Sequence, residues 1–398
     1  MILYQTMTYL PRVIEPYLLE LAGRFPCIGL TGPRQSGKST LLRHCFPNVP
    51  YVTFDDPEEE FAFRNDPKGF LARFSSAVIL DEVQRLPDLF RYVKMAVDAA
   101  PDKMGQFFLT GSNQFSLMHT AAESLAGRIG LLSLLPLELA EIPEKNRLPS
   151  LWSGAYPRLV LSDYQGSREW YSSYLSTYLE KDLRRVHDIG KLADFQILIR
   201  LLAARTGQEL NTASLAREIG VSAKTIDAWV SVLEAGHILY KLPPFHANLG
   251  KRLIKRPKVY FWDTGLVSSL VGIRNEETWE GGPLKGPLFE NYVVSESLKR
   301  ARHRGLDQEH FFYRDNAGKE IDLIIHDRAQ NTLTLCEIKA GQTPKVEWLA
   351  NLQTLSPLLQ STMGVPTTLR VIYRGETKQS WPRPGVAYAN DQLLLAPY

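Results

Sequence analysis

The stretch TGPRQSGKST, residues Thr31–Thr40, places two glycines five positions apart and follows the second with a lysine and two hydroxyl side chains. Its residues 32–39 match the pattern G-x-x-x-x-G-K-[ST] of a phosphate-binding loop. The apolar run PCIGL precedes the stretch, and STLLRHC, which has helical spacing, follows it. A strand, a glycine loop and a helix in this order favour phosphate binding over a glycine-rich turn that matches the pattern by chance.

The residue types in this loop predict how it would hold ATP. Glycines allow backbone N–H groups to curl around phosphate oxygens, and the N-terminus of the following helix adds its dipole. Lys38 would reach the β- and γ-phosphates, and the Ser39 hydroxyl would bind Mg²⁺. We therefore expect ATP and Mg²⁺ as cofactors, with nucleotide contacts from Gly32, Pro33, Arg34, Gln35, Ser36, Gly37, Lys38, Ser39 and Thr40.

Two acidic residues follow a second apolar run. The run is SAVILDE, in which four apolar residues precede Asp81 and Glu82, as in a parallel strand that is buried on both faces. Ligands bind at the carboxyl ends of such strands. Asp81 is predicted to hold the magnesium ion through water, and Glu82 to orient and deprotonate the attacking water. Two exposed acids at a strand end are the structural alternative.

Two further residues are candidates for catalysis. Asn113 ends the third apolar run, QFFLTGSN, where a polar side chain could sense the γ-phosphate or position the water. The same residues also suit a turn. Arg128 is a charge within the otherwise apolar stretch ESLAGRIGLLSLL, so it needs a partner or a position that faces solvent.

Five segments together resemble one protein family: GPRQSGKST, VILDE, FLTGS, LAGR and LPLELAE. They are similar to the AAA+-type ATPases that are joined to a DUF4143 C-terminal region, and the resemblance extends from about Leu21 to Gln342. It implies parallel strands with helices on both faces, and nucleotide bound at subunit edges of a ring or other homo-oligomer. It also implies that Arg128 acts as an arginine finger on a neighbour's γ-phosphate, and Arg34 fits the family's pattern.

Composition sets outer limits on the chain. Its 398 residues predict two to four domains, and its net charge of +3 is too small to identify a partner. From Lys181 to Lys258, fourteen lysines and arginines stand against seven acids, a candidate polyanion-binding region, although such runs are usually solvated faces. Three cysteines at unrelated spacing indicate neither disulfides nor a zinc site. Without a signal-peptide pattern or a membrane-spanning run, a cytoplasmic protein with no membrane partner is expected.

The segment NTASLAREIGVSAKTIDAWVSVLEAG predicts a helix-turn-helix. A helix over Thr212–Ile219 meets a turn at Gly220, and Ser222 would cap the second helix. The apolar strand HILYKL and a basic loop that runs to Lys258 follow, as in a winged helix. We expect DNA as a partner, although winged helices also serve as protein-contact modules. The predicted DNA contacts are Lys224, Thr225, Lys251, Arg252, Lys255 and Arg256.

The C-terminal part of the sequence predicts a hairpin with acids on one face. The strands KEIDLIIHD and NTLTLCEIKAG flank the turn RAQNT. Pairing that is symmetric about that turn sets Asp322 opposite Glu337. It also sets Glu320 opposite Lys339. Two acids with a lysine two residues on match the D…E-x-K arrangement of restriction-endonuclease-like folds, in which carboxylates hold metal and the lysine orients or deprotonates water.

This second resemblance implies a second metal site. It assigns metal ligation to Glu290, Asp322 and Glu337, and catalytic roles to Asp322, Glu337 and Lys339, although the literal Pro-Asp of that superfamily is absent. Cross-strand salt bridges would explain Glu320 with Lys339, but they would not explain the close pair of Asp322 and Glu337. Catalysis is a separate step, since such a fold can persist as a binding or structural module.

Together these signals predict an α/β chain with four parts: an AAA+-type ATPase domain (1–165), a helical linker (166–205), a winged helix-turn-helix (206–275) and a restriction-endonuclease-like domain (276–398). The predicted function is Mg²⁺-dependent ATP hydrolysis that acts on or is regulated by DNA, branched or junction DNA included, with a C-terminal domain that binds and could cleave DNA. The alternative is a nucleotide-gated switch that recruits a protein partner and carries a catalytically silent nuclease fold.

Overall fold

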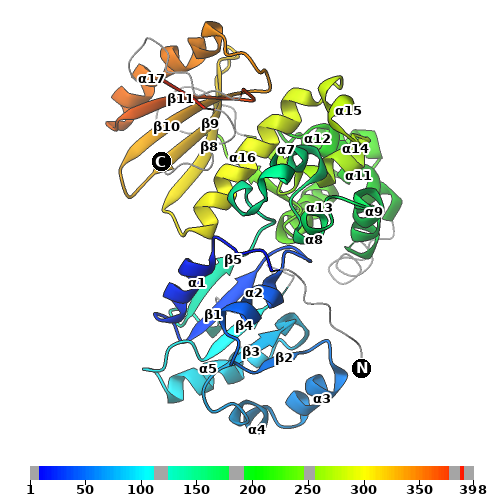
Figure 1. The fold of residues 1–398 in the computed structure, drawn as a ribbon, viewed down its shortest axis with the longest axis vertical. Coiled ribbons are helices and arrows are strands. Elements are labelled where there is room, and N and C mark those ends of the chain that lie inside the picture. Colours follow the sequence, from blue (N-terminus) through cyan, green and yellow to red (C-terminus); the bar gives the residue numbers. More distant parts are fainter. Residues whose placement is uncertain (1–8, 112–123, 179–191, 246–255, 376–385, 390–398) are drawn as a thin grey trace.

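The computed structural model describes residues 9–111, 124–178, 192–245, 256–375 and 386–389. Its N-terminal part is built on five parallel strands in the order β2-β3-β4-β1-β5 (Figure 1). They are β1 (Cys27–Thr31), β2 (Tyr51–Thr53), β3 (Val78–Asp81), β4 (Phe107–Thr110) and β5 (Ile129–Ser133). Because all five strands run the same way, the segments that follow β1, β3 and β4 emerge at one edge of the sheet.

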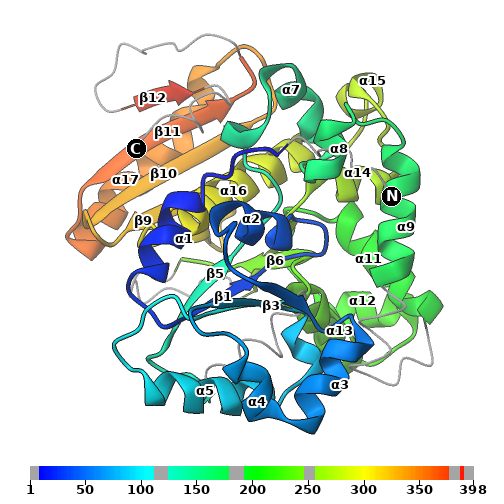
Figure 2. The same cartoon turned by 60° about the horizontal axis from the view of Figure 1, so that its bottom comes forward.

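Helices cover both faces of this sheet, as the resemblance to AAA+-type ATPases implies (Figure 2). Continuous apolar runs make this possible, since alternate residues of a strand point to opposite faces. Ile28 joins the core on one face, and Leu80 joins the core on the other. The helices on the first face are α1 (Glu15–Ala22) and α2 (Lys38–Cys45), and those on the second are α3 (Pro57–Asn65), α4 (Pro67–Ala72) and α5 (Leu89–Ala99).

A group of helices and one short hairpin follow the first sheet along the chain. Gly220 takes a left-handed φ of 83° between α12 and α13, and the Ser222 hydroxyl accepts a hydrogen bond from the Thr225 N–H at 3.0 Å, so the predicted turn and cap are both present. The elements are α7 (Glu144–Ser153), α8 (Pro157–Leu161), α9 (Ser167–Tyr178), α11 (Leu192–Ala204), α12 (Thr212–Ile219), α13 (Ala223–Ala235), the antiparallel strands β6 (Leu239–Leu242) and β7 (Lys258–Phe261), α14 (Thr264–Val271) and α15 (Glu276–Glu280).

The C-terminal part is a second sheet, of mixed direction, in the order β12-β11-β10-β9-β8, with α16 packed on one face and α17 on the other (Figure 1). The register predicted for the β9–β10 hairpin is confirmed from Thr332, which faces Asp327, to Cys336, which faces Leu323. The elements are α16 (Lys285–His303), β8 (Gln308–Arg314), β9 (Glu320–Asp327), β10 (Thr332–Lys339), the 3₁₀ turn η4 (Val346–Leu349), α17 (Ala350–Met363), β11 (Thr367–Tyr373) and β12 (Val386–Ala389).

An ion pair and buried hydrogen bonds join the segment after β5 to α16 and to the residue that follows it. The carboxylate of Glu138, just before the 3₁₀ turn η2 (Leu139–Glu141), accepts hydrogen bonds from the Arg304 guanidinium at 2.7 and 2.9 Å. Lys299 and Glu296 form a buried ion pair within α16 at 2.7 Å. Both also bond the backbone of the segment after β5: Lys299 donates to the carbonyl of Leu137 at 3.1 Å, and Glu296 accepts from the Leu139 N–H at 2.6 Å. Loss of one partner of a buried pair typically costs about 3–5 kcal/mol. The first sheet and α16 are therefore held in a defined arrangement.

The division into four parts at 165, 205 and 275 stays a prediction. Leu135, Leu151 and Tyr156, which precede the first of these boundaries, pack in one core with the helices and α16 rather than in either core of the first sheet. No helix in the described part of the chain combines the length and apolarity that a bilayer crossing requires.

Candidate nucleotide-binding site

The loop between β1 and α2 has the backbone that phosphate binding requires. Gly32 (φ 142°) and Gly37 (φ 95°) both lie at positive φ, and a Cβ on Gly32 would lie 2.1 Å from the carbonyl oxygen of Leu134. Lys38 is buried, and its ammonium donates to the carbonyls of Gly32 and Pro33 at 3.0 and 2.9 Å. The lysine is thus folded back over the loop, where it would meet phosphate oxygens.

Arg12, which has no place in the sequence motif, supports this loop. Its guanidinium donates to the carbonyls of Ser36 and Leu135, each at 2.8 Å, and its Nε lies 3.0 Å from the Glu141 carboxylate. Arg12 and Glu141 are both buried. The signal for Arg12 in the sequence is a lone cation within the largely apolar segment YLPRVIEPYLL, because a buried charge needs a partner.

Ser39 and Asp81 meet at the end of β3. The Ser39 hydroxyl donates to Asp81 Oδ2 at 2.7 Å, and the Tyr51 hydroxyl donates to the same oxygen at 2.5 Å. Burial, and next the hydrogen bond to Asp81, raise the pKa of Tyr51 above its usual range, so that Tyr51 stays a neutral donor. Mg²⁺ prefers hard oxygen ligands and takes only one or two from the protein, the rest coming from phosphates and water. Ser39 and Asp81 fit that requirement, and Tyr51 is an addition that the motif does not contain.

Glu82 follows Asp81 in a left-handed conformation, with φ of 56°, and precedes the 3₁₀ turn η1 (Val83–Arg85). The amide of Gln84 donates to its carboxylate. Burial, and next the charge of Asp81, raise the pKa of Glu82, while the charge of Lys38 acts in the opposite direction. Non-glycine residues at positive φ are uncommon and gather at functional sites. A partly desolvated carboxylate in this position suits the predicted role of general base.

One more polar group lies beside Asp81. Thr110, the last residue of β4, is the register partner of Asp81, and its buried hydroxyl has no hydrogen-bond partner in the described part of the chain. Asn113, the predicted sensor of the γ-phosphate, lies outside the described residues. Thr110 is therefore a polar side chain at the same strand end that sequence reasoning passed over, because threonine is common in strands.

Arg128 lies at the opposite end of the strands from the loop. Its carbonyl accepts a hydrogen bond from the N–H of Cys27 at 3.1 Å, at the start of β1, whereas the loop follows the end of that strand. A strand of this length spans about 17 Å. The guanidinium pairs with Asp98 at 2.6 Å and is partly exposed. A contact of Arg128 with nucleotide would thus be to the nucleotide of another subunit, as the predicted finger requires.

Helix α9 contacts the phosphate-binding loop directly. The indole N–H of Trp170 donates to Gln35 Oε1 at 3.1 Å, and Gln35 itself lies at a positive φ of 61°. Trp170 also stacks on Tyr174, with ring centroids 5.1 Å apart. The other predicted nucleotide contacts differ in exposure: Arg34 is half-buried, and Thr40 is exposed on α2.

A second acidic cluster lies where β9 and β10 approach α16. Asp322 Oδ2 accepts a hydrogen bond from the Ile338 N–H at 2.7 Å. The Lys339 ammonium lies 2.6 Å from Glu337 Oε1 and 3.5 Å from Asp322 Oδ2. Burial, and next the charge of Asp322, raise the pKa of Glu337 to about 7. The structure thus brings Asp322, Glu337 and Lys339 together as the sequence predicts, with the lysine between the two acids.

The rest of the predicted cluster is paired differently. Glu320 does not pair with Lys339; it lies 2.6 Å from the ammonium of Lys258, which also lies 2.8 Å from Glu290. Lys258 ends the predicted basic loop, but its side chain is buried against these acids and does not face solvent. Tyr260 donates to Glu290 at 2.6 Å.

The predicted metal shell of Glu290, Asp322 and Glu337 is not formed. Nowhere in the described ranges are three acidic, histidine or cysteine side chains grouped so that they could hold a metal ion. The physical reason is that lysines neutralise these carboxylates: Lys258 pairs with Glu290, and Lys339 lies against the other two.

The predicted DNA contacts fall only partly within the described residues. Lys224 is exposed in the first turn of α13. The hydroxyl of Thr225 is hydrogen-bonded to that of Ser222 at 2.8 Å. Arg256 is exposed shortly before β7. Outside the described residues lie Lys251, Arg252 and Lys255.

Three families match successive parts of the sequence. The AAA domain family matches residues 24–143, and two domains of unknown function, DUF8612 and DUF4143, match residues 149–277 and 285–389. Two uncharacterised proteins, one of Mycobacterium tuberculosis and one of Mycobacterium bovis, are each 31% identical over 374 residues, which is 93% of this chain and 81% of the relative.

Two solved structures resemble parts of the fold at low sequence identity. The Walker-type ATPase of Pyrococcus abyssi is 17% identical, with 65% of this chain and 94% of that one covered and a TM-score of 0.46. The ORC1 protein of Aeropyrum pernix, in complex with DNA, is 15% identical, with 67% and 95% covered and a TM-score of 0.30.

Proposed function

The chain belongs to the family of AAA-type P-loop ATPases with a DUF4143 C-terminal region, and from this premise we propose that it hydrolyses ATP with Mg²⁺ at the loop after β1. The observation that supports this most directly is the 2.7 Å hydrogen bond from the Ser39 hydroxyl to the Asp81 carboxylate. The bond joins the hydroxyl of the loop to the acid of β3, which are the two groups that hold magnesium in P-loop ATPases.

The residues around this hydrogen bond would each have a separate role in ATP hydrolysis. Lys38 would exchange the carbonyls of Gly32 and Pro33 for the β- and γ-phosphates. Ser39 and Asp81 would hold Mg²⁺, which when bound neutralises the charge of the phosphates. Glu82 would accept a proton from the attacking water, and its raised pKa makes it a better base than an exposed carboxylate.

Two contacts would transmit a change of the bound nucleotide from the phosphate-binding loop to other parts of the chain. Trp170 of α9 holds the side chain of Gln35, and Arg12 holds the carbonyl of Ser36 while also bonding Glu141. A change in the loop when Lys38 turns to phosphate would alter both contacts. This coupling is compatible with the ATPase that acts on DNA and with the nucleotide-gated switch. Both functions require ATP binding, but the first responds to DNA and the second recruits a protein partner.

Phosphate release by the full-length protein tests the proposal. We expect ATP turnover that requires Mg²⁺ and stops in EDTA. Ser39→Ala should raise the Mg²⁺ concentration needed for half-maximal turnover, whereas Ser361→Ala, at an exposed position of α17, should leave it unchanged. A chain that binds no ATP in Mg²⁺ would refute the proposal. Turnover in the presence of single-stranded, duplex and branched DNA separates the ATPase that acts on DNA from the switch, since only the former should be stimulated.

We further propose that α12, α13, β6 and β7 form a winged helix that contacts DNA. Support comes from the left-handed turn at Gly220, from exposed Lys224 at the start of α13 and from exposed Arg256 beside the basic loop. Binding should weaken as salt rises, and Lys224→Ala should reduce the slope of log K against log salt by about one. Binding to no DNA form at low salt would leave this unit as a protein-contact module.

For the C-terminal sheet we propose a restriction-endonuclease-like fold that binds without cutting. The support is the pairing of Lys339 with Glu337 and of Lys258 with Glu290, which satisfies acids that a nuclease would use for metal. Single-stranded, duplex and branched DNA should remain intact with the full-length protein in Mg²⁺ or Mn²⁺. Cleavage that disappears in Asp322→Ala would show the opposite.

We also propose that subunits associate so that Arg128 of one chain reaches the γ-phosphate bound by the next. Support comes from the position of Arg128 at the strand end opposite to the loop and from its partly exposed guanidinium. Sedimentation in the presence and absence of ATP tests for the homo-oligomer, and a chain that stays monomeric with ATP would remove this role.

A further inference from the structure

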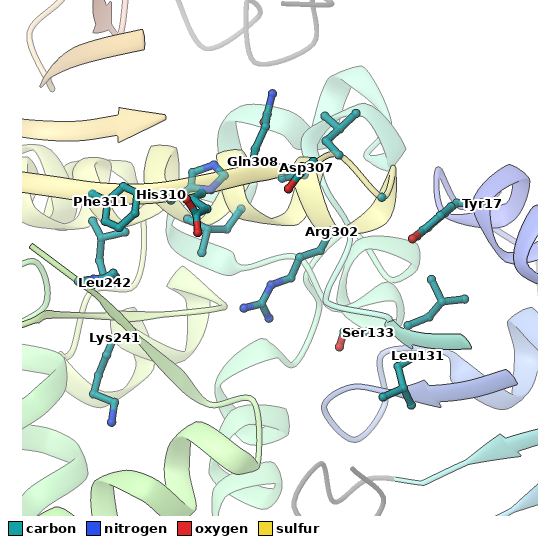
Figure 3. Close-up of a pocket in the computed structure, with 17 residues that line it drawn as sticks. Tyr17, Leu131, Ser133, Lys241, Leu242, Arg302, Asp307, Gln308, His310 and Phe311 are labelled. Atoms are coloured by element: carbon teal, nitrogen blue, oxygen red, sulfur yellow. The ribbon is translucent and has the colours of Figure 1, made fainter. Parts of the chain in front are cut away.

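A cavity of about 690 Å³ lies where the first sheet, β6 and the end of α16 meet (Figure 3). β5 and β8 both contribute to its wall, and each is the outermost strand of its sheet. None of the lining residues belongs to the phosphate-binding loop. Small-molecule sites typically have volumes of about 300–1,000 Å³ and lie between structural units. The cavity therefore has the size and place of a ligand site.

Several charged side chains line the cavity. Among them, Arg302, near the end of α16, forms no ion pair with a carboxylate in the described part of the chain. Its guanidinium lies over the ring of Trp262, 4.6 Å from the centroid. Figure 3 shows the side chain extended into the open space between β6 and β5. The other charged lining residues are paired: Lys241 with Glu234 at 2.8 Å, and Asp307 and Glu309 with Arg328 at 4.0 and 3.6 Å.

The histidines around Arg302 are neutral. His310 is hydrogen-bonded to the Ser297 hydroxyl at 3.0 Å, and burial, followed by the charge of Arg302, lowers its pKa to about 4. His237 is buried with neither ring nitrogen hydrogen-bonded among the described residues, and the same two causes lower its pKa to about 3. At neutral pH these two histidines therefore add no positive charge, and Arg302 is the cation that faces the cavity.

The C-terminal end of a helix attracts cations, and this is the simplest explanation for an arginine at this position. The same explanation applies to Arg304, which pairs with Glu138. It does not explain why Arg302 is directed into a cavity and stacks on the indole of Trp262. A guanidinium that is held by stacking is pre-organised for two parallel hydrogen bonds to phosphate.

We propose that this cavity binds a small molecule that carries a phosphate group, anchored by Arg302, and an apolar body. The composition of the wall supports the second part, because ligand sites combine apolar surface with a few polar groups. The apolar lining residues are Leu131, Leu132, Leu242, Pro243, Leu298 and Phe311.

Strand β5 connects this cavity to the nucleotide site. Leu131 and Ser133 line the cavity, and the next residue, Leu134, packs against Gly32 of the phosphate-binding loop. The carbonyl of Leu135 then bonds Arg12, which holds the loop from its other side. A ligand that fixes β5 would therefore change the support of the loop, and we expect it to alter ATP affinity. The site itself does not depend on ATP hydrolysis.

The test uses full-length Lys38→Ala protein, in which the phosphate-binding loop is disabled, and phenyl phosphate, which joins a phosphate to an apolar ring. Calorimetric titration at constant ionic strength should show saturable binding. Arg302→Gln should raise Kd at least tenfold, the equivalent of about 1.4 kcal/mol. Arg274→Gln, which removes an exposed cation between α14 and α15, should leave Kd unchanged. Hydrogen exchange should slow at residues 131–133 and 302–311.

Arg302→Lys sharpens the test, because it keeps the charge and removes the planar fork; its Kd should lie between those of the parent and Arg302→Gln. If Arg302→Gln fails to fold, protection of Arg302 from phenylglyoxal by phenyl phosphate, read by mass spectrometry, gives the same information. Equal Kd in the parent and Arg302→Gln, no saturable binding, or no protection would overturn the proposal.

Discussion

The two acidic clusters of this chain, one at the end of β3 and one in the β9–β10 hairpin, use the same residue types in opposite ways. In the first, Asp81 accepts hydrogen bonds from neutral hydroxyls, that of Ser39 among them. In the second, Asp322 and Glu337 face the ammonium of Lys339. Neutral donors leave the negative charge available to a cation, whereas an ammonium at 2.6 Å already satisfies it.

The two clusters differ because the nearest lysine of each bonds a different kind of group. Lys38 donates to the backbone carbonyls of Gly32 and Pro33, while Lys339 forms an ion pair with the Glu337 carboxylate. Buried carboxylates need a counter-charge in either case. Acid and lysine spacing thus places the residues but does not say which charge neutralises which. We expect a magnesium ion at the first cluster and none at the second.

Replacement of the lysine of each cluster by alanine should show the difference between the two clusters most strongly. Lys38→Ala should lower ATP affinity at least a hundredfold and reduce turnover to background, because the ammonium over the loop is lost. Lys339→Ala is the matched control and should leave ATP affinity unchanged. Fluorescent-nucleotide titration measures both variants. Wild-type affinity in Lys38→Ala, or a loss in Lys339→Ala, contradicts the assignment.

Exchange of one acid in each cluster should have the next largest effect. Glu82→Gln should bind ATP as the wild type does and hydrolyse it about a hundredfold more slowly, since the general base is lost. Glu337→Gln, at the second cluster, should leave kcat unchanged. Single-turnover phosphate release distinguishes the two. Normal turnover in Glu82→Gln would move the role to another residue, Asn113 being the first to test.

The second cluster should be visible in the pH dependence of stability. Because the pKa of Glu337 is raised from 4.5 to about 7, the folded state holds its proton more tightly than the unfolded state. The stability this contributes is fully present below pH 4.5 and is lost as pH rises through 7. Between pH 5 and pH 8, the free energy of unfolding of Glu337→Gln should therefore rise by roughly 2–3 kcal/mol relative to that of the wild type. Urea unfolding at both pH values measures the gain, and a pH-independent difference counts against the raised pKa.

The smallest expected effect concerns Arg128. Neither Arg128→Ala nor Glu82→Gln subunits should hydrolyse ATP well alone, because each lacks one half of the site. A mixture should recover a fraction of wild-type turnover where an intact Arg128 meets an intact Glu82 across subunits. Phosphate release across mixing ratios measures the recovery. In a confirmed oligomer, no recovery at any ratio would return Arg128 to its ion pair with Asp98 alone.

Local determinants explain which features the sequence predicts. The strand, loop and helix around Lys38 are contiguous, so the motif suffices to place them. Parallel strands meet at one edge, so the proximity of Ser39 and Asp81 follows from two short segments. The β9–β10 register follows from a short turn, and it is confirmed over five pairs.

Long-range packing explains what the sequence does not predict. Tyr51 and Arg12 reach the nucleotide site from other segments of the chain. Lys258 reaches Glu290 and Glu320 because β7, α16 and β9 converge, which no local pattern encodes. The pairing of β8 with β9 also shifts between Phe311 and Tyr313, and such an irregularity interrupts the alternation of faces from which the acid face was predicted.

The divalent cation should bind at Asp81 and not at the β9–β10 hairpin. Electron paramagnetic resonance of Mn²⁺ with the full-length protein and a non-hydrolysable ATP analogue tests it directly. We predict bound Mn²⁺ that requires the nucleotide, is lost in Asp81→Asn and persists in Asp322→Asn. Mn²⁺ that binds without nucleotide, persists in Asp81→Asn and disappears in Asp322→Asn would contradict the account.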